Sequence, residues 1–185
     1  MATISNSDLF KAYLAYFGRP PDITGISYFS NKTEAEVVAA FSASPESQAL
    51  LNSLGDVPSF VNSVYLNLFN RPAEFTGPGS ATHWVDMITL GHMTQAEAAM
   101  AILRGAMNGD ADTVQAKYNA SVAFVNALDT AAEVTGYSGA EAAQDGRDFL
   151  HSVDAAHIPT PAQINAAVLV ATTPNPVIVP TPTMD

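Results

Sequence analysis

The sequence predicts an all-α protein: a helical bundle built from two duplicated helix-turn-helix repeats and about three further helices. Apolar residues between Phe60 and Phe69 recur at the spacing of one helix face. The same pattern occurs 52 residues earlier, between Leu9 and Phe17. No stretch alternates apolar and polar residues for long enough to predict a half-buried strand.

The duplication continues position by position through the end of this helix. The matched pairs, each 52 residues apart, are Tyr13 and Tyr65, Phe17 and Phe69, Arg19 and Arg71, Pro20 and Pro72, and Asp22 and Glu74. Because proline cannot continue a helix, we expect Arg-Pro to end the first helix in each copy. Repeat one is then expected over about residues 8–54 and repeat two over about 59–108, with one shared hydrophobic interior.

Helix starts are predicted from capping patterns along the whole chain. Thr33 and Thr94 are each followed three residues later by glutamate, which is a capping box, and Ser5 precedes Asp8 in a similar way. Ser138 followed by Glu141 predicts another capping box, opening a helix to about Val153.

The second half of the chain is expected to add helices within about residues 113–171. Residues 113–134 are predicted to form one long helix, and residues 160–170 the last one. Apolar residues expected along the long helix are Val114, Tyr118, Val122, Val125 and Leu128. Residues 172–185 are rich in proline, which predicts an extended linker after a domain of residues 1–171. We expect such a linker to lead to a further part of a longer protein.

Composition narrows the classes of function. The 185 residues include seven basic and eighteen acidic side chains, giving a net charge of -11, and no cysteine. Nucleic acid is therefore not an expected partner, since phosphate binding needs a basic face. Direct membrane insertion is not expected either, because no apolar run reaches the length of a span, and the first residues lack the pattern of a signal peptide.

The repeat, from Tyr13 through Arg19-Pro20 and from Tyr65 through Arg71-Pro72 to Trp84, resembles a helical repeat of type I-secreted bacterial proteins. That repeat is catalogued as a domain of unknown function. It is also similar to the N-terminal anchoring domains of Gram-negative surface-layer (S-layer) proteins. The resemblance implies a non-enzymatic domain at the cell surface that binds the O-polysaccharide of lipopolysaccharide and holds a lattice of neighbouring copies. It also implies export directed by a C-terminal signal rather than by an N-terminal signal peptide.

Polar and aromatic residues near the helix ends are the candidate sugar-binding groups. In each repeat an arginine precedes a carboxylate by three residues, and such donor and acceptor pairs suit sugar hydroxyls. The alternative is structural, with the arginine capping carbonyl groups and fixing the loop. Tyr16 and Tyr137 are expected to be exposed aromatics, His83 is a weaker candidate, and Trp84 is expected in the core. The candidate residues are Tyr16, Arg19, Asp22, Arg71, Glu74, His83 and Tyr137.

Calcium is the one cofactor that the sequence suggests. Asn108, Asp110 and Asp112 alternate oxygen-bearing side chains, as at the start of a calcium loop. Calcium would also screen the acidic domain from phosphorylated lipopolysaccharide. The alternative is a turn in which Asp112 caps the next helix.

The predicted function is therefore a cell-surface anchor that binds lipopolysaccharide, with calcium as an accessory ion. Because no nucleophile motif, phosphate loop or zinc-binding helix occurs, no enzymatic activity is expected. The alternative is a scaffold or oligomerisation module of a type I-secreted adhesin or enzyme with no glycan site. A linker like those of light-harvesting antennae is a third, weaker option.

Overall fold

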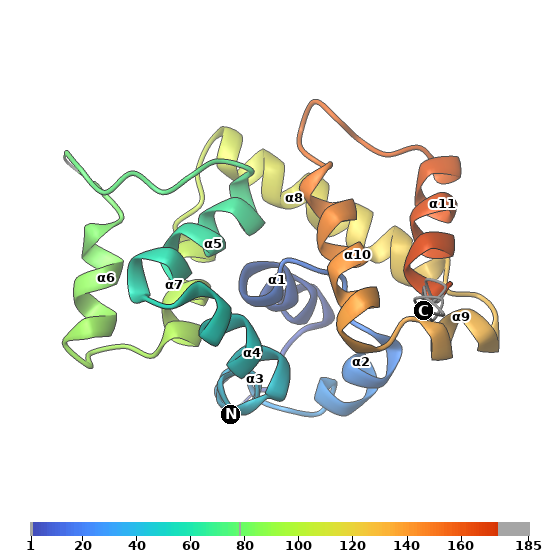
Figure 1. Cartoon of the computed structure of the whole chain (residues 1–185), viewed down its shortest axis with the longest axis horizontal. Coiled ribbons are helices and arrows are strands. Elements are labelled where there is room, and N and C mark those ends of the chain that lie inside the picture. The colour runs from blue at the N-terminus through green and yellow to red at the C-terminus, as the bar shows by residue number, and fades with distance from the viewer. Residues whose placement is uncertain (1, 78, 174–185) are drawn as a thin grey trace, which may run out of the picture.

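The computed structural model describes residues 2–77 and 79–173, and within these ranges the chain forms eleven helices and no strand (Figure 1). The predicted all-α class is confirmed. Residues 174–185, most of the predicted linker, lie outside the described residues. Within the described part, no helix is both long and apolar enough to cross a membrane. The helices are α1 (Asn6–Phe17), α2 (Ile23–Phe29), α3 (Glu34–Ala43), α4 (Pro45–Leu54), α5 (Val57–Phe69), α6 (Thr82–Thr89), α7 (Gln95–Arg104), α8 (Gly109–Asn126), α9 (Ala131–Gly136), α10 (Gly139–His151) and α11 (Pro161–Thr172).

Most predicted helix starts are confirmed by their caps. Thr33 and Thr94 form complete capping boxes at α3 and α7, and Ser5 caps α1 by accepting a hydrogen bond from the Asp8 amide. The capping box predicted at Ser138 is wrong: among the described residues its hydroxyl has no amide partner in α10 and donates instead to the carbonyl of Thr135.

The two helices that were expected to end at Arg-Pro end before it. Gly18 and Asn70 adopt left-handed conformations, with φ of 69° and 54°, and they form the C-caps of α1 and α5. This conformation turns the chain away from the helix axis, so proline is not needed to stop the helix. The arginine that follows folds back over the aromatic rings of its own helix in both segments. The Arg19 guanidinium carbon lies 5.3 Å from the centre of the Tyr13 ring, and that of Arg71 lies 5.4 Å from the Tyr65 ring.

The main hydrophobic core joins the segments predicted as repeats. α1 lies in the middle of the molecule, with α5 and α7 beside it, and α3 packs against α7 (Figure 1). Leu9 and Leu14 of α1 and Phe60 of α5 are fully buried in this core. Burying side chains of this size stabilises the fold by roughly 1.5–3 kcal/mol each. Trp84 is half-buried and packs against the same core.

A second, smaller core lies among α8, α9, α10 and α11. Phe124 is its fully buried centre, and Ile164 and Val168 of α11 pack on it. Phe149 of α10 contacts both cores. The two cores are thus continuous through α10, which packs against α5, α8 and α11.

The predicted helix over residues 113–134 is wrong in its extent. α8 begins at Gly109 and ends at Asn126, and a separate helix, α9, begins after Thr130. The cause is local: Thr130 and Glu133 form a capping box, which fixes a new helix start. A helix over residues 23–29 was also not anticipated, and it starts because Asp22 accepts a hydrogen bond from the Gly25 amide.

The buried face of α8 contains a lysine that the apolar spacing did not predict. Lys117 is fully buried, and its Nζ donates to the Asn67 carbonyl and to Asn70 Oδ1, each at 2.6 Å. It therefore binds carbonyl oxygen at the C-terminal end of α5, where a helix favours a cation. Burial lowers the pKa of Lys117 to about 7 despite the opposing charge of Asp154.

Candidate ligand-binding groove

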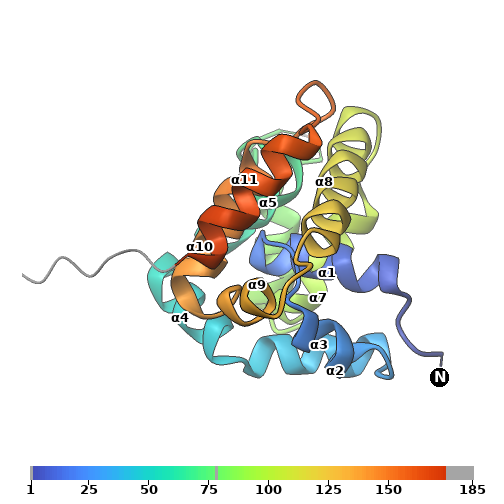
Figure 2. The same ribbon diagram turned by 90° about the vertical axis from the view of Figure 1, so that its right-hand side faces the viewer.

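A groove of about 990 Å³ opens between α2, α4, α9 and α10. Its walls are one face along α4, one face of α10 as far as Arg147, the end of α9, and the loop that leads from α1 into α2. Figure 2 views the molecule from the side on which α4, α9 and α10 meet. Its polar lining consists mainly of side chains that bond to one another.

The loop after α1 places Arg19 in the groove wall. The Gly18 amide donates to the carbonyls of Tyr13 and Leu14, each at 3.1 Å, which closes the helix and reverses the chain. Gly18 is needed there on two counts: its φ is positive, and a Cβ would collide with the side chain of Asn67. The turn therefore directs Arg19 away from the axis of α1 and into the groove wall.

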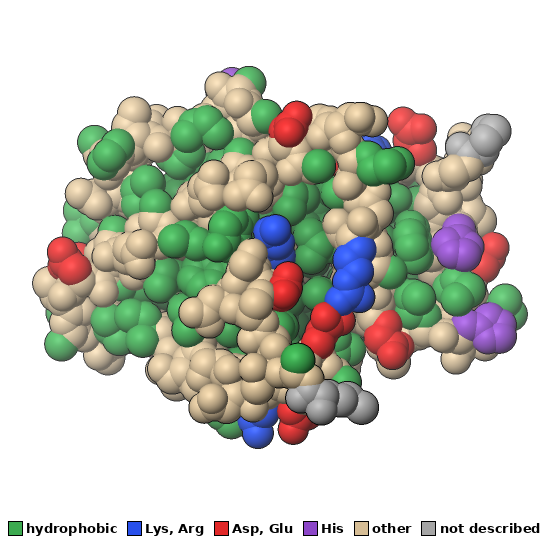
Figure 3. Space-filling model, turned by 180° about the vertical axis from the view of Figure 1, so that it is seen from behind, with side chains coloured by type: hydrophobic (Ala, Val, Ile, Leu, Met, Phe, Trp, Pro, Cys, Tyr) green, Lys and Arg blue, Asp and Glu red, His purple; other side chains and the backbone are tan. Residues whose placement is uncertain are grey.

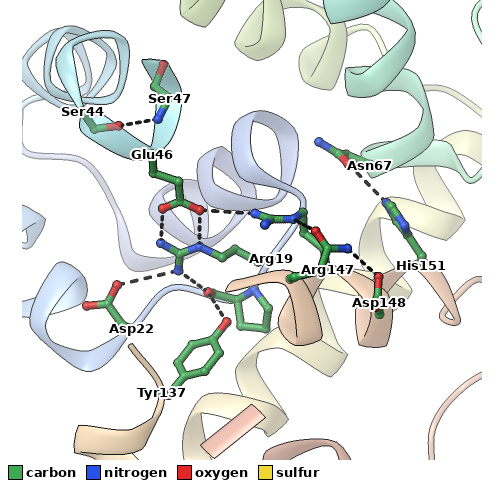
Figure 4. A network of polar contacts seen from close by, with 12 residues as sticks. Arg19, Asp22, Ser44, Glu46, Ser47, Asn67, Tyr137, Arg147, Asp148 and His151 are labelled. Atoms are coloured by element: carbon green, nitrogen blue, oxygen red, sulfur yellow. Dashed lines mark hydrogen bonds and ion pairs between the residues drawn. The ribbon is translucent and has the colours of Figure 1, made fainter. Parts of the chain in front are cut away.

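The Arg19 guanidinium is buried, and each of its three nitrogens donates a hydrogen bond (Figure 4). Nε and Nη2 donate to the two carboxylate oxygens of Glu46 at 2.8 and 2.6 Å, and Nη1 donates to the Pro20 carbonyl at 3.0 Å. Burial alone would raise the pKa of the Glu46 carboxyl, but the hydrogen bonds and charge of Arg19 outweigh it and lower the pKa. The pair is therefore ionised, and it joins α4 to the loop after α1.

Tyr137 closes the other side of this wall. Its hydroxyl donates to the Pro20 carbonyl at 2.9 Å, and burial raises its pKa, so that it stays a neutral donor. α10 can pack here only because residue 146 is glycine: a Cβ at Gly146 would lie 2.5 Å from the Tyr137 hydroxyl oxygen. The loop, α9 and α10 are thus in direct contact at one point.

Arg147 of α10 adds a second guanidinium to the groove. Its Nη1 donates to Glu46 Oε1 at 3.3 Å and its Nε to Gln144 Oε1 at 3.0 Å. Glu46 therefore lies between two arginines, and Asp22 lies on the other side of Arg19, 3.7 Å from Nη1 (Figure 4).

The rest of the lining is a mixture of hydroxyl and apolar groups. Hydroxyls come from Thr24, Ser53, Thr135 and Ser138, and apolar surface comes from Pro45, Ala49, Leu50, Val134, Ala140 and Ala143. Such a groove can bind a ligand that presents both hydroxyls and apolar C–H faces, and in its polar part also a charged group.

Three of the predicted site residues meet in this groove: Arg19, Asp22 and Tyr137. The expected exposure of Tyr137 and Tyr16 is nevertheless wrong, because each is only 3% exposed. Tyr16 lies under α4, where its hydroxyl is 2.8 Å from Ser47 Oγ, since α4 covers the face of α1 that carries it. Tyr137 is covered by packing against Phe124.

The remaining candidates lie apart from the groove. Arg71 is exposed and pairs with Asp110, Nη2 to Oδ2 at 2.6 Å, whereas Glu74 and His83 are exposed side chains of the segment predicted as the second repeat. The two Arg-Pro loops therefore have different surroundings: the first is buried in a groove wall and the second faces outward.

The predicted calcium residues lie at the start of α8. Asp110 and Asp112 are in its first turn, and the expectation that Asp112 caps this helix is wrong, because Asn108 occupies the cap position. Asp110 already pairs with Arg71. Within the described residues no three His, Asp or Glu side chains are grouped so as to hold a metal ion. Calcium binding stays a prediction.

Sequence reasoning missed Glu46, Gln144 and Arg147. Glu46 is 27 residues from Arg19 and 101 from Arg147, and nothing in the sequence relates these positions. The only local signal was the Ser44-Pro45 helix start, which puts Glu46 in the first turn of α4.

The fold and the groove together define an all-α bundle with one polar, ion-paired groove wall. Comparisons of the chain with descriptions of protein families, with curated proteins and with solved structures return no match.

Proposed function

We propose that this chain is a non-enzymatic cell-surface anchoring module that binds the O-polysaccharide of lipopolysaccharide in the groove between α2, α4, α9 and α10. The resemblance of the repeats to surface-layer anchors and type I-secreted proteins supports the proposal. It rests on one observation above all: Arg147, Asp22 and several hydroxyls share a groove with apolar surface.

A sugar hydroxyl both donates and accepts hydrogen bonds, so a sugar-binding site needs donors and acceptors side by side. Arg147 supplies donors, Asp22 supplies carboxylate oxygen, and the apolar strip along α4 suits the C–H face of a sugar ring. The buried Arg19–Glu46 pair holds the wall in place, so its role is structural.

Binding is tested with purified smooth and rough lipopolysaccharide, which differ in the O-polysaccharide. We expect the protein to sediment with smooth lipopolysaccharide only. Ala49→Trp, which fills the groove from an exposed position on α4, should abolish this binding. The control is Ala39→Trp, at an exposed position on α3 outside the groove lining, which should bind normally. Equal and negligible binding to both lipopolysaccharides, with calcium present, rejects the anchor.

Calcium assistance belongs to this proposal and has its own test. The net charge of -11 gives calcium a physical role in bringing the domain to phosphorylated lipopolysaccharide. We expect millimolar calcium, and not magnesium, to raise the melting temperature, and Asp112→Asn to remove the shift. No shift with calcium rejects the accessory ion and leaves the groove proposal intact.

A scaffold or oligomerisation module is the second candidate. Large apolar side chains are exposed at Leu90, Met107, Leu169 and Val170. Figure 3 shows apolar side chains at many points of the face opposite to that of Figure 1, between polar surface and a group of acidic and basic side chains near the centre. This candidate requires a defined oligomer in sedimentation velocity without any glycan, whereas the anchor does not.

A further inference from the structure

Arg147 differs from the other groove arginine in having one nitrogen, Nη2, that makes no hydrogen bond to a described residue. All three nitrogens of the Arg19 guanidinium are bonded, to Glu46 and Pro20. Arg147 uses Nε and Nη1, and its Nη2 donates to no described residue. The Arg147 side chain is only 18% exposed, so this nitrogen is partly removed from water inside the groove.

The charged side chains of the groove are two arginines and two carboxylates, and Glu46 is the carboxylate that contacts Arg147. Glu46 already accepts two short hydrogen bonds from Arg19, and its contact with Arg147 is longer, at 3.3 Å. Glu46 is thus shared between two guanidinium groups. Asp22 approaches only the far side of Arg19 (Figure 4), and Asp148 accepts its hydrogen bond from Gln144 rather than from Arg147.

A carboxylate is the group that best completes this arrangement. Guanidinium groups bind carboxylates through charge-assisted hydrogen bonds, about twice as strong as those between neutral groups. The first turn of α10 lines the same groove and directs the positive end of its dipole there, which also favours a negative charge. An uncharged sugar would leave Arg147 Nη2 with only a hydroxyl.

We propose that Arg147 binds the carboxylate of an acidic sugar residue, a hexuronic acid, within a polysaccharide held in this groove. This proposal rests on the proposed function, because it names the class of sugar that the same groove selects. Ring hydroxyls of that sugar meet Thr135 and Ser138, which line the groove on the side of α9 and α10. The net charge of the protein does not prevent this contact, because repulsion by distant carboxylates is screened beyond about 8 Å at physiological salt.

The test compares acids with their own methyl esters. Trisaccharides of galacturonic, glucuronic and mannuronic acid, each beside its fully methyl-esterified form, are titrated into the full chain and followed by NMR of the arginine Nε–H groups. We expect at least one acid to bind ten-fold or more tightly than its ester and to shift the Arg147 signal. Arg147→Gln should remove the preference, and Arg147→Lys, which keeps the charge without the fork, should retain part of it.

Arg104→Gln is the control, since Arg104 makes an exposed ion pair with Glu34 outside the groove. It should keep the full preference for the acid. Circular dichroism establishes that each variant is folded, and Arg147→Lys carries the test if Arg147→Gln does not fold.

The outcomes separate this proposal from the proposed function. If acids and esters bind equally, or if none binds while smooth lipopolysaccharide does, the carboxylate proposal is overturned and the anchor survives. If neither the trisaccharides nor lipopolysaccharide bind, both are overturned. Tighter binding of galactose 6-phosphate than of every acid would overturn the carboxylate in favour of phosphate.

Discussion

Arg19 and Arg71 occupy matching sequence positions, yet their surroundings give them different energetic weight. The Arg19 side chain is 10% exposed and bonds both oxygens of Glu46, whereas the Arg71 side chain is 44% exposed where it pairs with Asp110. Breaking a buried ion pair leaves a charge without compensation, while an exposed pair is screened by water.

Replacing each arginine by glutamine measures this difference. Arg19→Gln should lower the free energy of unfolding by about 3 kcal/mol, because Glu46 keeps only its long contact with Arg147. Arg71→Gln should lower it by less than about 1 kcal/mol. Urea unfolding measures the free energy of unfolding of both variants. Equal decreases would show that the burial of Arg19 does not determine its contribution to stability.

Lys117 predicts how stability depends on pH. Its pKa is about 7 in the folded protein and near the ordinary 10.5 when unfolded. Between these values the unfolded chain binds more protons, so stability should rise as the pH increases from about 7 towards 10. Below about pH 7 the lysine is charged in both states, and the cost of burying the charge is present in full.

Urea midpoints of the natural chain and of Lys117→Met between pH 7 and 9.5 test this assignment. The rise should be present in the natural chain and much smaller in the variant. This range stays below the titration of Tyr13 and Tyr137, whose pKa values burial raises. A rise of the same size in both proteins would assign it to other groups.

At the scale of the helix, the end of α1 depends on one glycine. Gly18 combines a positive φ with close contact to Asn67 of α5. Gly91 has nearly the same φ of 72°, but a Cβ there would meet no described atom within 4 Å. Gly91→Ala should therefore cost only the backbone strain, about 1–2 kcal/mol, and Gly18→Ala more, because the buried Asn67 side chain must also be displaced.

Thermal unfolding followed by circular dichroism compares the two variants. If Gly18→Ala and Gly91→Ala lower the melting temperature equally, the close contact of Gly18 with Asn67 adds nothing to the loss of stability.

Features that depend on neighbouring residues could be predicted from the sequence, and features that depend on distant ones could not. The capping boxes of Thr33 and Thr94 involve residues three apart, so their pattern is visible locally. The box at Thr130 has the same local pattern, but the helical spacing of apolar residues from Val114 to Leu128 predicted one continuous helix through it. In contrast, Arg147 and Glu46 meet only because α4 and α10 are brought together by tertiary packing.

The same distinction explains the candidate site. Arg19 and Asp22 were predicted from the repeated loop, and they line the groove. Exposure of Tyr16 and Tyr137 was predicted wrongly, because it depends on which helices cover them. The burial of Lys117 could not be predicted from the sequence, since a lysine on a helix face ordinarily faces water.

At the scale of the whole molecule, two cores are joined at Phe149. Its ring lies 5.5 Å from that of Phe124 in the smaller core, and it also packs on the main one. We expect the natural chain to unfold in a single transition. Phe149→Ala should uncouple the cores, so that part of the helical signal is lost before the main core opens.

Trp84, the single tryptophan, packs on the main core, so its fluorescence reports that part while circular dichroism reports all helices. The two signals should coincide during urea unfolding of the natural chain and separate in Phe149→Ala. Coincident curves in the variant would mean that other contacts, such as that of Tyr137 with Pro20, suffice to keep the cores together.

The Arg19, Glu46 and Tyr137 contacts hold one side of the groove in a fixed shape before anything enters it. A ligand would then lose conformational entropy on binding, but the protein would lose little on that side of the groove. Binding should accordingly occur at a preorganised site, with a small change in protein order and without closure of a loop over the ligand.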